Sequence, residues 1–91
     1  MANSSQTIRY NIILRPEPEG GFTVIVPALV GCITYGKNLA EAQKMAQEAI
    51  GLYLESLVED GEKIPESDQA YIGSIEVASP RVRKSGVPAH A

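Results

Sequence analysis

The sequence has few residues that build metal sites or nucleophilic centres. Its 91 residues include one cysteine, Cys32, and one histidine, His90. One cysteine excludes an internal disulfide, and two such residues are too few to hold zinc. His90 lies in a polar terminal segment, whereas a catalytic group needs rigid support. Cys32 fits a small buried apolar residue better than a nucleophile. We therefore predict no enzymatic activity, no cofactor and no metal.

Long apolar runs and a basic surplus are also missing. No segment approaches the roughly 18 apolar residues of a membrane span, and the polar first residues lack the apolar core of a signal peptide. Together with the single cysteine, this predicts a cytosolic protein. The net charge of -3 disfavours nucleic acid as the main partner and favours a basic protein. The short basic cluster at 81–84 has no aromatic residue to stack on bases, so we interpret it as a solvated tail.

Three short β-strands are predicted in the first half of the chain. Residues 8–15 alternate between apolar and polar side chains, with period 2. A turn rich in proline and glycine at 16–21 leads into residues 22–26, so the two strands should form an antiparallel hairpin. Residues 32–35 are short and rich in β-forming side chains, and they predict a third strand.

One long helix is predicted over residues 39–60. Asn38 is a good N-cap, and Glu41 stands three residues later, as a capping box requires. Gly61 is placed to end the helix, and Pro65 prevents a restart. Residues 71–77 predict a fourth strand. The expected fold is a small α+β domain of order β-β-β-α-β at 8–78, with one helix packed on one face of the sheet, a disordered lead-in at 1–7 and a flexible tail at 79–91.

Several motifs resemble the HicB antitoxin family. Pro27-Ala28-Leu29-Val30-Gly31-Cys32 matches its P-x-L-x-G-C element, which lies between two strands and is followed by a glycine, here Gly36, and a helix. Asn38–Ala42 and Ala49-Ile50 are similar to the family's helix, and Asp60-Gly61 with Ile64-Pro65 to its helix exit. The resemblance covers about residues 8–77, and the motifs occur in the family's order.

The resemblance implies a fold and a role. The fold is a partial ribonuclease-H-like mixed sheet whose fourth strand is parallel to the first. The role is to bind and block a HicA-type toxin, a small mRNA-cleaving ribonuclease, without catalysis. Many members also carry a C-terminal domain that binds operator DNA. Fourteen residues follow Val77 in this sequence, too few for such a domain, so DNA binding is not expected.

Two sets of side chains are candidate contacts. Acidic residues on the hairpin tip and the outer helix face would meet a basic toxin; these are Glu17, Glu19, Glu41, Glu48 and Glu55. Met45 and Leu52 form an apolar strip beside the core stripe of the helix, and a dimer or tetramer could bury them. Loops could cover the same strip equally well.

Other functions stay open at this point. The chain could be an orphan HicB-like module that binds nucleic acid or another protein and has no toxin partner. A ribonuclease-H-shaped hydrolase is the weakest reading, because such chemistry needs clustered carboxylates and the predicted strands carry only Glu76.

Overall fold

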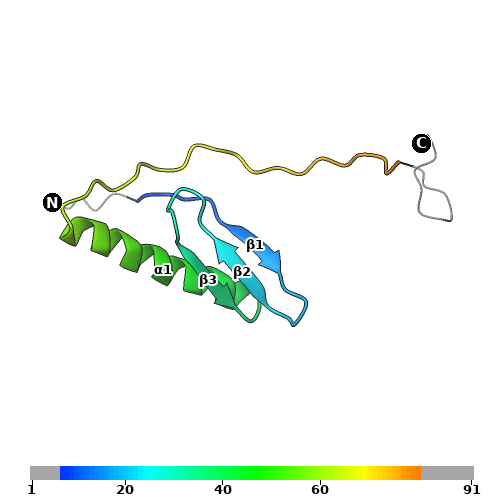
Figure 1. The fold of residues 1–91 in the computed structure, drawn as a ribbon, viewed down its shortest axis with the longest axis horizontal. Coiled ribbons are helices and arrows are strands. Elements are labelled where there is room, and N and C mark those ends of the chain that lie inside the picture. The colour runs from blue at the N-terminus through cyan, green and yellow to red at the C-terminus, as the bar shows by residue number, and fades with distance from the viewer. Residues whose placement is uncertain (1–6, 81–91) are drawn as a thin grey trace.

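The computed structural model describes residues 7–80. Three strands, β1 (Ile13–Pro16), β2 (Phe22–Ile25) and β3 (Ile33–Gly36), precede one helix, α1 (Leu39–Glu59). The strands form an antiparallel sheet in the order β1-β2-β3, and α1 lies along one face of it (Figure 1). The predicted α+β class, and its order of three strands followed by a helix, are confirmed.

The core lies between the helix and the inner face of the sheet. Val24 at the centre of β2 is fully buried against Ala42 and Ala46 of α1. Leu14 and Phe22 add partly buried side chains to this cluster. Alternate residues of β1 and β2 thus point toward the helix, as the period-2 pattern predicts.

The start of α1 lies very close to Gly36, the last residue of β3. A Cβ atom built on Gly36 would lie 2.3 Å from both the N and the Cα of Ala42. No side chain fits in that space. A glycine facing an alanine therefore sets how closely the start of α1 can lie against the sheet.

The Pro27–Cys32 element is a folded loop that supplies core residues. The Val26 N–H donates to the Cys32 carbonyl at 3.1 Å, and the Cys32 N–H donates to the Leu29 carbonyl at 3.0 Å. Gly31 has a φ of 80°, which favours glycine. Leu29 and Cys32 are buried beside Val26. The P-x-L-x-G-C element at 27–32 thus supplies two core side chains and a glycine that the tight loop requires.

The C-terminal end of α1 follows the expected stop signal. The Gly61 N–H donates to the Val58 carbonyl at 3.1 Å, and the Glu62 N–H donates to the Leu57 carbonyl at 2.8 Å. Gly61 has a φ of 73°. This pair of bonds is the Schellman motif, which satisfies carbonyls left free at a helix end.

The outer strands differ from the prediction. The first strand covers only Ile13–Pro16 instead of residues 8–15. Residues 67–70 run beside residues 9–11 in the same direction, and the Asp68 N–H donates to the Arg9 carbonyl at 2.8 Å. This direction agrees with the implied parallel crossover.

The fourth strand predicted at 71–77 is not formed in the described part of the chain. A strand needs a neighbour for its backbone groups. The Asn11 side chain bonds to the Ala70 carbonyl, and the segment that follows extends away from the sheet (Figure 1). The ribonuclease-H-like topology requires that strand and stays a prediction. The predicted lead-in and tail fall almost entirely on residues 1–6 and 81–91, outside the described residues, as do His90 and the basic cluster.

Candidate interaction surfaces

The sheet face that points away from α1 has no covering layer among the described residues. Strand register places Ile13 opposite Ile25, and Ile25 opposite Ile33. These isoleucines form a row across all three strands, and Ile33 is 60% exposed. Exposed apolar groups that adjoin one another often mark a contact surface.

A tyrosine extends this apolar row toward the hairpin turn. The Tyr35 hydroxyl donates to the Gly20 carbonyl at 2.9 Å, so its ring lies over the turn. A Cβ atom at Gly21 would lie only 2.1 Å from the Tyr35 hydroxyl oxygen, and the φ of Gly21 is 80°. We define the open sheet face as the surface made by these side chains: Ile13, Ile25, Ile33 and Tyr35.

Sequence reasoning missed the open sheet face, although a signal was present. The alternation of the three predicted strands identifies the apolar residues of the inner, helix-facing side. On the opposite face of the same strands, Ile13, Ile25 and Ile33 are apolar, although Arg15 and Thr23 on that face are polar. A strand with apolar side chains on both faces indicates that both faces are covered in the functional state.

Two of the five acidic candidates have structural partners. Glu17 is half-buried, and its carboxylate accepts a 2.5 Å hydrogen bond from the Thr23 hydroxyl. The Glu41 carboxylate accepts from the Lys37 N–H at 2.6 Å. Both side chains hold local structure, which makes them poorer candidates for partner binding.

The other three acidic candidates are exposed but do not form one patch. Glu19 lies in the turn between β1 and β2, and this hairpin tip lies beside the N-terminal end of α1 (Figure 1). Glu55 lies toward the C-terminal end of the helix. Glu41 marks the first turn of α1, at the same end as the hairpin tip. Fourteen residues separate it from Glu55, so the two ends lie about 21 Å apart along the helix axis. Only Glu48 and Glu55 share one surface, two turns apart on the exposed side of α1.

The C-terminal half of α1 has an unusual charge arrangement. Its last turn contains no basic residue and carries Glu59. Carboxylates near a helix C-terminus are unfavourable, because the macrodipole is negative there. Glu48 and Glu55 flank Leu52, which is 67% exposed. We define the acidic helix end as these residues: Glu48, Leu52, Glu55 and Glu59.

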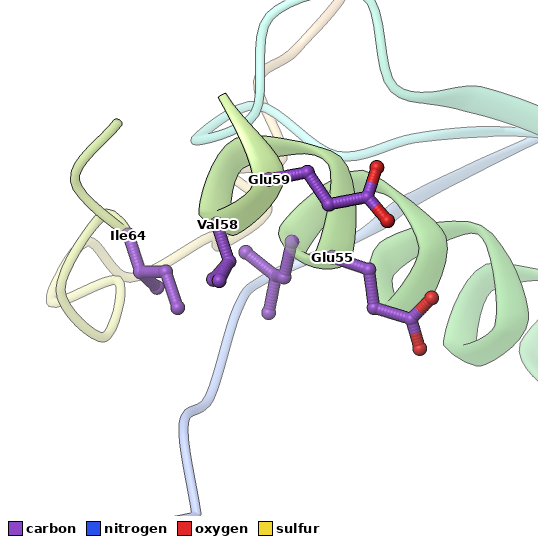
Figure 2. A pocket seen from close by; sticks show the side chains of 5 residues that line it. Glu55, Val58, Glu59 and Ile64 are labelled. Atoms are coloured by element: carbon purple, nitrogen blue, oxygen red, sulfur yellow. The ribbon is translucent and has the colours of Figure 1, made fainter. Parts of the chain in front are cut away.

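A shallow hollow of about 450 Å³ adjoins the acidic helix end. Its lining combines apolar and acidic side chains: Leu54, Glu55, Val58, Glu59 and Ile64. In Figure 2, Val58 and Ile64 lie side by side, while the Glu55 and Glu59 carboxylates extend away from Ile64. An apolar group flanked by cationic ones would suit this surface.

The two predicted oligomer contacts have different surroundings. Met45 is half-buried on the flank of α1, whereas Leu52 is largely exposed within the acidic helix end. Their role in self-association stays a prediction.

Cys32 is buried in the core, and Tyr10 is half-buried. Burial raises the pKa of the Cys32 thiol and of the Tyr10 phenol. The Tyr10 hydroxyl also donates to the Pro65 carbonyl. Within residues 7–80, no group of three or more His, Cys, Asp or Glu side chains is placed to hold a metal ion. In the same range, no helix has the length and apolar character needed to cross a membrane.

Comparison with known proteins assigns this chain to a family. A sequence model described as the HicB-like antitoxin of bacterial toxin–antitoxin systems matches residues 10–79. The chain belongs to the HicB-like antitoxin family. Membership in an antitoxin family favours a non-enzymatic role.

Relatives of this HicB-like chain are of two lengths. A UPF0150 protein of Thermoplasma acidophilum is 45% identical over 58 residues, which cover 64% of this chain and 84% of that protein. A UPF0150 protein of Synechocystis is 36% identical over 63 residues, 69% of this chain and 80% of its own length. Antitoxin HicB of Escherichia coli K12 is 36% identical over 58 residues, 64% of this chain but only 42% of the antitoxin.

The HicB-like match extends through residues 71–77, the segment that leaves the sheet. This segment is therefore part of the family's domain and not an appended tail. Its apolar side chains need an explanation within the fold of the HicB-like domain.

Proposed function

We propose that the chain is a cytoplasmic antitoxin that binds and neutralises a HicA-type, mRNA-cleaving toxin. The family match over residues 10–79 carries this proposal, because it spans the sheet, the helix and the segment that follows. The antitoxin HicB proteins among the relatives support it. Neutralisation would occur through protein contacts and would require no chemistry from this chain.

The acidic helix end is the surface that best fits such a partner. A toxin that cleaves mRNA must approach phosphates, so it needs a basic surface. Glu48, Glu55 and Glu59 offer complementary charge, which speeds encounter and favours correct partners. The exposed Leu52 between them supplies an apolar anchor that a partner could bury.

DNA binding does not form part of the proposal. The net charge of -3 gives no basic surplus to neutralise phosphates. Among the described residues, the helix face most open to solvent carries carboxylates, which would repel a phosphate backbone.

The test is co-expression with the small protein encoded beside this chain's gene, scored for growth and for co-purification. Growth arrest by that protein alone, relieved when this chain is co-expressed, together with a stable complex, is the expected result. Growth arrest that persists without any complex would contradict the proposal. The chain would then be an orphan HicB-like module with a different partner.

A further inference from the structure

The segment at 71–77 exposes apolar side chains that a lone domain would ordinarily bury. Tyr71 is 96% exposed and Ile75 is 87% exposed, and Ile72 and Val77 are also open to solvent. Figure 1 shows this segment, in yellow to orange, extending past the sheet without contacting it. Tyrosine, isoleucine and valine favour β-strands, so the segment has the composition of a strand without a neighbour.

A matching edge exists on β1. In the sheet order β1-β2-β3, β1 pairs only with β2. Its other side presents backbone groups of Ile13–Pro16 with no strand beside them among the described residues. Unpaired edges of this kind are templates for another strand.

The backbone bond between Asp68 and Arg9 indicates the register in which the segment would pair with that edge. The Asp68 N–H donates to the Arg9 carbonyl at 2.8 Å, and the Asn11 side-chain amide donates to the Ala70 carbonyl. In a parallel ladder, the first bond pairs Arg9 with Ser67.

Continued pairing in this register joins apolar residues on both faces of the sheet. It would set Tyr71 beside Ile13 on the open sheet face, and Ile72 beside Leu14 on the helix side. Tyr71 would then extend the row Ile13, Ile25 and Ile33 to a fourth strand. The segment and the β1 edge are thus complementary in pattern as well as in hydrogen bonding.

We propose that residues 71–77 of one chain pair with β1 of a second copy, so that two chains exchange their fourth strands. Each copy has one free β1 edge and one departing segment, and a reciprocal exchange satisfies both pairs in a closed dimer. An extended chain of seven residues spans about 23 Å, which is enough to reach a neighbouring domain. A small domain buries a low fraction of its surface, so this added burial would stabilise it substantially.

The exchange can be tested with disulfides between paired positions. The register places Arg15 beside Gly73, and cysteines in such a pair can form a disulfide when their Cα atoms lie about 5.5 Å apart. We would unfold full-length chains that carry only Arg15→Cys together with chains that carry only Gly73→Cys and refold the mixture, so that mixed dimers can form. The native Cys32 is buried and present in both variants, so the unmodified chain shows how much disulfide forms without the introduced cysteines.

A covalent dimer that links the two different variants, with a light-scattering mass of twice 9.8 kDa for the unmodified chain, is the expected result. A monomer mass, with a disulfide only inside the double variant Arg15→Cys/Gly73→Cys, would overturn the exchange in favour of pairing within one chain. Binding of the segment only to a toxin chain, with no dimer, would overturn it as well.

A second pair of variants separates strand exchange from other modes of self-association. Ile72→Pro removes a ladder N–H from the segment and should convert the dimer to monomer with unchanged circular dichroism of the helix. Ile33→Asp changes the open sheet face and should leave the dimer intact. The reverse pattern would show that sheet faces pack together and would overturn the proposal.

Discussion

Gly36 shows how strongly one residue can constrain the distance between the sheet and the helix. A Cβ atom at this position would meet the backbone of Ala42, which cannot move away as a flexible side chain could. We expect Gly36→Ala to lower the free energy of unfolding by about 1–3 kcal/mol, the usual range for overpacking. Urea denaturation followed by circular dichroism measures this change.

Gly51 is the matched control for that substitution. It lies in the exposed part of α1, and a Cβ atom there would have nothing within 4 Å. Gly51→Ala should raise the free energy of unfolding by about 1 kcal/mol, because alanine favours the helix. If both substitutions had the same sign, close packing at Gly36 would not be the cause.

Cys32 provides a test of burial by reactivity. Its thiol lies in the core and has a raised pKa, so little reactive thiolate is present. At mildly alkaline pH, a thiol reagent should modify the folded chain about tenfold or more slowly than the chain in denaturing urea. Equal rates would show that the Pro27–Cys32 loop opens freely.

The same pKa shift predicts how stability changes with pH. The folded chain holds the Cys32 proton more tightly than the unfolded chain. This contribution to stability is fully present below the ordinary pKa of a thiol and is lost as the pH rises through the raised pKa of the folded state. Cys32→Ala should reduce the loss of stability at alkaline pH, measured by urea denaturation across that range.

At the scale of elements, α1 depends on its N-terminal cap. The Asn38 side-chain oxygen accepts from the Glu41 N–H at 2.8 Å. The Glu41 carboxylate accepts a hydrogen bond from the Lys37 N–H. In a standard capping box it would accept from the N–H of the cap residue, here Asn38. Asn38→Ala should lower the free energy of unfolding by about 1 kcal/mol, whereas Asn38→Asp should preserve it. Equal losses in thermal unfolding would show that the cap does not stabilise α1.

The sequence was most informative where local signals agree. Helix α1 could be predicted to within a residue at its end, because Asn38 and Gly61 are strong terminal signals. The hairpin followed from alternation and from the glycines of its turn. The prediction of a fourth strand at 71–77 was wrong, because a strand forms only beside a neighbouring strand. No local sequence pattern shows whether that neighbouring strand is in place.

At the scale of the whole molecule, the acidic helix end should control association with a toxin. The double variant Glu48→Lys/Glu55→Lys is expected to weaken toxin binding by about tenfold or more, because it places like charges against a basic surface. Isothermal titration at two salt concentrations measures this effect. Added salt should weaken the unmodified complex more than the variant complex, because salt screens the attraction between exposed charges.

Glu19→Lys at the hairpin tip is the control for that surface. It changes the net charge but lies at the opposite end of α1, so its effect should be several-fold smaller, since screening limits exposed charges to about 10 Å. If Glu19→Lys weakened binding as strongly as the helix variants, the toxin interface would lie at the hairpin. The five candidates predicted from sequence could not be ranked earlier, because sequence shows neither the bonds of Glu17 and Glu41 nor the distance between the two ends.

The bond between Asp68 and Arg9 also has a consequence for the order of events during synthesis. These residues are far apart in the chain, so the edge of β1 emerges from the ribosome well before the segment that can pair with it. The hairpin and α1 rely on nearer contacts and can form first, because contacts between distant residues are slower to close. During this interval, a neighbouring nascent chain on the same message could reach the waiting edge first. Assembly would then be decided at translation, and diluting the finished protein would reverse it only slowly.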